Sequence, residues 1–77
     1  MDMRQVVAIN FKRLRTEAGL SQHAVADRMG VDRAYVSGLE MGKRNPTVIT
    51  LWHIANALGV RPADLVDDKA LEPETSA

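Results

Sequence analysis

The sequence predicts an all-α fold of five helices in one small domain. Four glycines each follow a stretch of helical periodicity, where a left-handed residue ends a helix; they are Gly19, Gly30, Gly42 and Gly59. No segment alternates apolar and polar residues with a period of two, so strands are not expected. The chain has 77 residues and no cysteine, a length that provides for one modest hydrophobic core.

The first helix is expected over residues 6–18, because apolar side chains recur at four- and three-residue intervals and form one stripe. That stripe consists of Val7, Phe11 and Leu14. The second helix is expected to begin at the N-cap residue Ser21 and to end near Met29. Its inward face is predicted to comprise Val25, Ala26 and Met29.

The third helix is expected over residues 33–41, after the short link Gly30-Val31-Asp32. At 100° per residue, its inward side is predicted to hold Val36, Leu39, Asp32 and Glu40. Its outward side is predicted to hold Ala34, Ser37, Gly38 and Met41, with Arg33 at the edge. This outward side is nearly free of bulky side chains, which permits close approach to the surface of another molecule or close packing against a neighbouring helix.

A fourth helix is expected over residues 48–58, after the cap residue Thr47 and a polar, basic loop at 42–46. Its apolar stripe is predicted to be Val48, Leu51, Ile54, Ala55 and Leu58. Pro62 suits the first turn of a short fifth helix that contains Leu65 and Val66. We therefore expect one domain over residues 1–68 and an acidic, disordered C-terminal tail over residues 69–77.

The formal net charge of zero hides an uneven distribution. Residues 1–63 carry nine Lys/Arg and five Asp/Glu, a net charge of +4, whereas residues 64–77 carry one Lys and five acids, a net charge of −4. A ligand meets the local field rather than the average. The net positive charge of residues 1–63 favours a polyanionic partner. The acidic residues at 64–77 are typical of a solvated tail without a specific function.

Several function classes are not expected. Apolar runs of at most four residues predict no membrane span and no signal peptide. The absence of cysteine and the presence of only His23 and His53 argue against a zinc site and favour a reducing, cytoplasmic setting. No nucleophile–base set and no phosphate-binding glycine loop is visible, so we expect neither an enzyme nor a bound cofactor.

Two short helices joined by a turn of about three residues form a helix-turn-helix unit, whose second helix enters the DNA major groove. Three blocks around this unit resemble the phage repressor/Cro (XRE) family of helix-turn-helix proteins. They are Leu20-Ser21-Gln22-x-x-Val25-Ala26-x-x-Met29-Gly30-Val31, Tyr35-Val36-Ser37-x-Leu39-Glu40-x-Gly42-Lys43-Arg44-x-Pro46, and Leu51-x-x-Ile54-Ala55-x-Ala57-Leu58-Gly59-Val60. The resemblance covers residues 7–66 and implies a five-helix, lambda-repressor-like DNA-binding domain.

The resemblance also implies roles for particular side chains. The positions that match base-reading residues are Arg33, Ala34, Ser37 and Gly38, and Arg33 suits a bidentate contact to guanine O6 and N7. The positions that match phosphate-binding residues are Gln22, Tyr35, Lys43, Arg44 and Asn45, with outer contacts from Lys12 and Arg13. Gln22 also matches a residue that braces the recognition helix. Tyr35 is equally suited to the edge of the core, and Lys12 and Arg13 to plain solvation.

Arg15 and Glu40 match a partly buried ion pair that ties the first helix to the third in the family, so both are expected to be structural. The expected function is a sequence-specific regulator of transcription that binds double-stranded DNA, as a dimeric repressor with helix 33–41 in the major groove. The dimer contact is expected at Ile49, Trp52 and Val66, which alternatively complete the core. The alternative function is a protein-interaction module of the antitoxin or coactivator type on the same scaffold, bound to an unknown protein partner.

Overall fold

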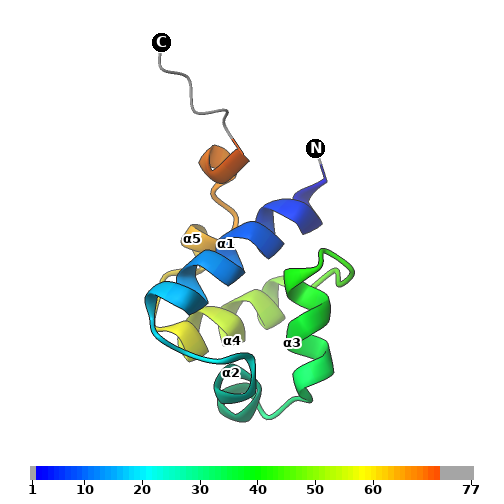
Figure 1. The fold of residues 1–77 in the computed structure, drawn as a ribbon. Helices are drawn as coiled ribbons and strands as arrows, with labels where there is room; N and C mark the ends of the chain where they lie inside the picture. The colour runs from blue at the N-terminus through cyan, green and yellow to red at the C-terminus, as the bar shows by residue number, and fades with distance from the viewer. Residues whose placement is uncertain (1, 72–77) are drawn as a thin grey trace.

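The computed structural model describes residues 2–71, with five α-helices and one 3-10 turn. The helices are α1 (Met3–Glu17), α2 (Gln22–Met29), α3 (Arg33–Glu40), α4 (Val48–Leu58) and α5 (Pro62–Leu65), followed by the turn η1 (Asp68–Leu71). α1 packs against α3 and α5, and α2 packs against α3 and α4. The start of α1 and η1 lie at the end of the molecule opposite α2 (Figure 1). None of the helices in this part of the chain is both long and apolar enough to cross a membrane.

Side-chain caps fix the starts of two helices where the sequence predicts them. Ser21 accepts a hydrogen bond from the Ala24 amide at 3.0 Å, and Thr47 accepts one from the Thr50 amide at 3.1 Å. Each cap satisfies an amide that lacks a partner within the helix. The second and fourth helices, Gln22–Met29 and Val48–Leu58, also end where the sequence predicts, so both of their predicted bounds are confirmed.

The first helix begins three residues earlier than the sequence analysis expects. Asp2 is its N-cap and accepts a hydrogen bond from the Arg4 amide at 2.9 Å. The Asp2 carboxylate also accepts a hydrogen bond from Arg4 Nε at 2.9 Å, which is the main reason that the pKa of Asp2 falls to about 2. The apolar stripe does not predict this early start, because the first buried residues of the helix are Val6 and Val7. The start is set instead by the N-cap residue Asp2.

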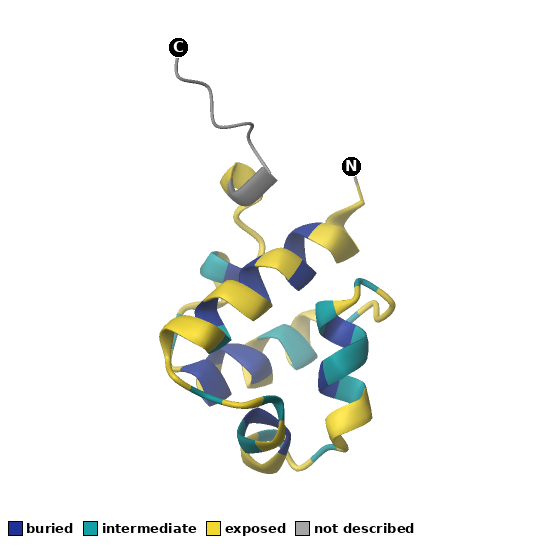
Figure 2. Cartoon of the chain, viewed as in Figure 1, coloured by how far each residue is buried: buried dark blue, intermediate teal, exposed yellow. Residues whose placement is uncertain are grey.

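One face of every α-helix packs into the hydrophobic core (Figure 2). Its most deeply buried apolar side chains, each at most 1% exposed, are Val6, Phe11, Val25, Val36, Leu39, Ile54, Ala55 and Leu65. The predicted stripe of the first helix is buried, and Met29, Leu51 and Tyr35 pack against the core from its margin. Burial of this apolar surface stabilises the helices, which are individually too short to persist in water.

Two predicted inward positions are wrong. Val48 is 80% exposed, because it occupies the first position of α4, before the helix reaches the core. Asp32 is exposed because it precedes α3, with an extended backbone at φ −72° and ψ 149°, so that the helical wheel does not apply to it. Asp32 also makes no side-chain cap hydrogen bond.

The start of the predicted tail differs from the expectation as well. Residues 68–71 form η1, which contacts α1, where disorder is predicted from residue 69. Residues 72–77 of the predicted tail lie outside the described residues. Asn10, fully buried in α1, donates hydrogen bonds from Nδ2 to the carbonyl oxygens of Leu65 and Asp67 at 3.0 and 2.9 Å. These bonds hold the chain that leads from α5 into η1.

Candidate nucleic-acid interface

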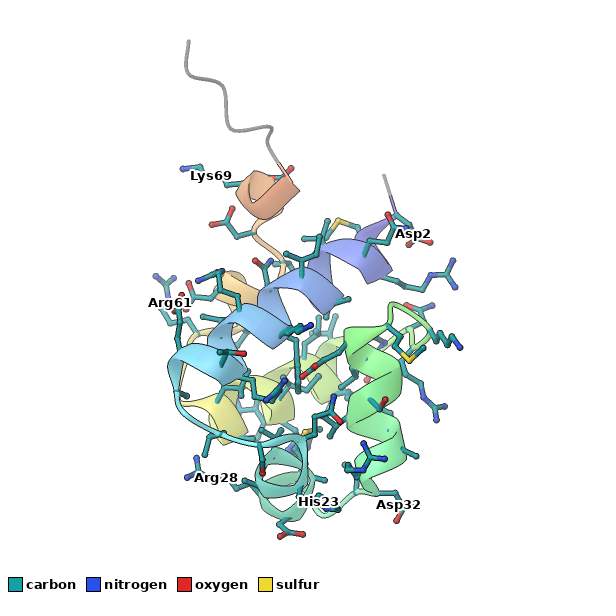
Figure 3. All side chains as sticks on the ribbon, in the orientation of Figure 1. Asp2, His23, Arg28, Asp32, Arg61 and Lys69 are labelled. Carbon is teal, nitrogen blue, oxygen red and sulfur yellow. The ribbon has the colours of Figure 1, made fainter. Side chains whose placement is uncertain are left out.

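The helix α2, the link 30–32 and the helix α3 form a helix-turn-helix unit, with α2 at one end of the molecule and α3 along one side (Figure 1). Gly30 ends α2 in the left-handed conformation, at φ 71°, and the Val31 amide donates back to the Ala26 carbonyl at 3.0 Å. This closure turns the chain sharply enough for α3 to start within three residues. Figure 3 shows Asp32 at the beginning of α3 and His23 on α2.

The side of α2 that faces away from α3 contacts the end of α4. Arg28, in the last turn of α2, donates from Nη1 to the carbonyl oxygen of Ala57 at 2.9 Å, and Figure 3 shows it on the side of α2 that faces away from α3. A cation here satisfies a carbonyl at the end of α4, where the helix dipole is negative. Arg28 therefore fixes the unit to the rest of the domain.

The small-residue side of α3 points outward. Ala34 is exposed, Ser37 and Gly38 are half-buried, and Met41, just past the helix end, is 61% exposed. Ser37 donates from Oγ to the sulfur of Met41 at 3.9 Å. Within residues 2–69 no neighbouring helix covers Ala34, so the close-packing alternative is wrong for this position. The outward face of α3 at Ala34 and Ser37 is therefore accessible and carries only small side chains.

Arg33 is held at the edge of this surface by Gln22. Arg33 Nη1 donates to Gln22 Oε1 at 2.8 Å, and Gln22 Nε2 donates to Glu40 Oε1 at 3.1 Å. The amide group uses its acceptor on one side and a donor on the other. Arg33 itself remains exposed, so its guanidinium is braced at one nitrogen and open to solvent at others.

Glu40 also forms an ion pair with Arg15, a cation on α1. Arg15 donates to Glu40 from Nε and, at 3.1 Å, from Nη2, and its third contact is the Leu20 carbonyl at 2.8 Å. The side chains of Arg15 and Glu40 are only 15% and 7% exposed. The hydrogen bond to Glu40 raises the pKa of Arg15 above its ordinary value. Sequence reasoning pairs these two residues but misses that Glu40 also orients Gln22.

The loop after α3 carries the basic residues. Lys43, Arg44 and Asn45 are exposed. The guanidinium carbon of Arg44 lies 5.1 Å from the centre of the Tyr35 ring, within the range of a cation–π contact. Tyr35 is half-buried and packs against the core, as its core-edge alternative expects, while its contact with a phosphate stays a prediction.

The cations of α1 are placed differently. Lys12 and Arg13 are exposed, and Arg13 forms an ion pair with Glu17 at 3.4 Å. Arg13 Nη2 also donates to Asn10 Oδ1 at 3.5 Å. Arg13 is therefore partly neutralised, whereas within the described part of the chain no acid forms an ion pair with Lys43 or Arg44.

The residues predicted for a dimer contact lie on the surface. Ile49, Trp52 and Val66 are 66%, 53% and 39% exposed, and the Trp52 ring meets His53 edge to face at 5.1 Å. They do not complete the core, so that alternative is wrong, whereas Leu65 is fully buried. Exposed apolar groups of this size favour contact with another surface.

A helix-turn-helix family profile (HTH_3) matches residues 11–65, which span α2, α3, α4 and α5 entirely. The chain belongs to this helix-turn-helix family. An uncharacterised HTH-type transcriptional regulator, y4dJ, of Sinorhizobium fredii is 56% identical over 66 residues, which cover 86% of each chain. The predicted family and the predicted all-α fold are confirmed.

Solved structures agree with this assignment. The restriction-modification controller protein C.AhdI from Aeromonas hydrophila is 37% identical and superposes with a TM-score of 0.76, covering 80% of this chain and 94% of its own. The controller protein C.Esp1396I, solved as a tetramer with its natural 35-base-pair operator, is 28% identical with a TM-score of 0.81, covering 94% and 99%. The expected function class, a DNA-binding transcriptional regulator, is confirmed by these relatives.

Proposed function

We propose that this chain binds a specific site on double-stranded DNA as a homodimer and represses transcription by occupying a promoter. The observation that carries the proposal is the braced guanidinium of Arg33 beside an exposed, small-residue helix face. Such a face fits a major groove about 12 Å wide, and a fixed guanidinium suits the paired acceptors of guanine. C.Esp1396I, a relative of the same fold, has been solved on its operator.

The residues divide into two kinds of contact. Arg33 reads a base, while the small residues Ala34 and Ser37 let the helix approach the base edges. Phosphate contacts come from exposed or half-buried polar groups around the helix, namely Gln22, Tyr35, Lys43, Arg44, Asn45 and Lys12. These contacts supply affinity and register but little sequence information.

The dimer places two copies of α3 on successive turns of one face of the DNA, about 34–36 Å apart. Ile49, Trp52 and Val66 form the proposed contact, because each is apolar and exposed and none belongs to the DNA-facing helix. An aromatic residue at the centre of such a contact is a frequent anchor. The proposal involves no catalytic step and no cofactor, and it places the protein in the cytoplasm, with the DNA it regulates.

A salt series with random duplex DNA tests the proposal. A dimer with about eight phosphate contacts gives a slope of about −7 in log K against log salt concentration, at about −0.9 per contact. Lys43→Ala lowers the affinity for all sequences alike and makes the slope shallower. Absence of DNA binding at low salt would overturn the proposal and favour the protein-interaction module.

A further inference from the structure

Gly38 occupies the interior of α3, where glycine is unfavourable compared with alanine. Its backbone is ordinary for a helix, since Gly38 is not among the residues with positive φ. The reason for a glycine here is therefore space and not conformation. A Cβ atom built on Gly38 would lie 3.0 Å from Nε and 3.2 Å from Cγ of Arg44. The missing side chain makes room for Arg44.

The end of α3 directs Arg44 to this position. The Lys43 amide donates to the Gly38 carbonyl at 2.9 Å, and the Gly42 amide donates to the Leu39 carbonyl at 3.2 Å. With Gly42 in the left-handed conformation at φ 73°, these two bonds form a Schellman motif. The motif reverses the chain directly after the helix. Arg44, the next residue along, is thereby returned over the last turn of α3.

Gly38 and Tyr35 together form the place that holds the Arg44 side chain, which we call the seat, and Tyr35 provides its second side. It lies three residues before Gly38 and so is its neighbour on the helix surface. The ring is half-buried against the core and faces the Arg44 guanidinium at 5.1 Å. Tyr35, Ala34 and Arg44 also line one surface hollow of about 660 Å³ beside the link 30–32. The stem of Arg44 therefore crosses Gly38, and its charge rests against Tyr35.

We propose that Gly38 is a positioning residue that acts through Arg44. The bare helix position and the Tyr35 ring hold the Arg44 guanidinium on the outward side of α3, ready for DNA, before any DNA is bound. A long side chain that is already ordered loses less conformational entropy on binding. This inference rests on the proposed DNA binding, and it replaces close approach to bases as the role of Gly38.

The seat is tested first in the free protein. Tyr35 is the only tyrosine, so its ring signals are readily assigned in NMR spectra. In the wild type we expect ring-current shifts of the Arg44 side-chain protons. These shifts become smaller in Gly38→Ala, because the added Cβ displaces the Arg44 side chain, and the protein stays folded because that side chain is exposed. Ser37→Ala, the neighbouring position, is the matched control and leaves them in place. Unchanged Arg44 shifts in a folded Gly38→Ala protein would overturn the proposal.

A double-mutant cycle tests the consequence for DNA binding. Gly38→Ala weakens binding by about 3–10-fold in the wild-type background, the cost of ordering one long side chain. The same substitution has no further effect when Arg44→Ala is already present. Equal weakening in both backgrounds would show that Gly38 contacts DNA directly and would overturn the proposal. A wild type that binds no DNA contradicts the proposed function instead, and the NMR comparison still decides the seat.

Discussion

At the scale of single residues, a chain of hydrogen bonds links the partly buried ion pair of Arg15 and Glu40 to Arg33, the residue proposed to read a base. Arg15 holds Glu40, Glu40 orients the amide of Gln22, and Gln22 braces Arg33. The first two members are largely buried and the last is exposed. Stability and recognition therefore share a set of side chains, and both depend on the position of one carboxylate.

Removing the cation from this carboxylate is expected to destabilise the fold. Arg15→Met leaves Glu40 largely buried without its ion-pair partner, and we expect a loss of about 3 kcal/mol in the free energy of unfolding. Arg13→Met breaks the exposed pair with Glu17 on the same helix and is expected to cost under about 0.5 kcal/mol. Urea unfolding of both variants provides the measurement. Similar losses in the two would refute a special role for Arg15.

The sequence predicts which residue types gather at this site but not all of their partners. Arg33, Gln22 and the pair of Arg15 and Glu40 are recognised from the family pattern, and each lies on a helix that the sequence predicts. The contact of Glu40 with Gln22 and the seat of Arg44 on Gly38 depend on how separate segments meet. Such contacts are set by tertiary packing, which periodicity within one helix does not encode.

At the scale of elements, α1 depends on a cap that is sensitive to acid. The folded protein lowers the pKa of Asp2 from 3.8 to about 2, chiefly through its hydrogen bond with the Arg4 side chain. A depressed pKa means that the stabilising contribution is present above pH 3.8 and is lost as the pH falls through about 2. We expect the first turn of α1 to fray over this interval.

NMR signals of the Arg4 amide, recorded from pH 5 to pH 1, provide the measurement for this cap. The matched variant Asp2→Asn keeps a capping oxygen but has no carboxyl group to titrate. Its Arg4 amide is expected to show no transition below pH 4. A transition that persists in Asp2→Asn would mean that another group controls the start of the helix.

The buried Asn10 is expected to hold the end of the domain. Asn10→Ala leaves the carbonyl oxygens of Leu65 and Asp67 without their donor, which we expect to cost about 1–3 kcal/mol. Hydrogen exchange should accelerate first in α5 and η1, whereas α2 and α3 keep their protection. Asn56→Ala, at an exposed position of α4, is the control and should change neither. Uniform loss of protection would contradict a local role for Asn10.

The bounds of the elements were predictable where caps and glycines mark them, as at Ser21 and Thr47. The early start of α1 and the turn η1 were not, because the first depends on one polar residue outside the apolar stripe. The second is held by contacts with α1, more than fifty residues away along the chain. The local sequence pattern predicts that a helix forms. How far the chain beyond that helix is ordered depends on contacts with other parts of the fold.

At the scale of the whole molecule, exposed apolar side chains at the start of α4 and after α5 are expected to join two copies. Trp52→Glu places a charge in the proposed contact and is expected to shift the protein from dimer to monomer in analytical ultracentrifugation. Ile9→Glu, at a 43% exposed position on α1, is the matched control and should remain dimeric. Equal masses for wild type and Trp52→Glu would place the dimer contact elsewhere.

The central claim is that α3 reads DNA sequence through Arg33, and selection from a random pool of duplex DNA tests it most directly. The wild type is predicted to enrich one site with a guanine at a fixed position in each half-site. Arg33→Ala is predicted to lose the preference at that position, worth about 1–3 kcal/mol, while the other positions persist. If Arg33→Ala instead lowered the affinity for every sequence equally and enriched the same bases, Arg33 would contact only the DNA backbone, and the account would be contradicted.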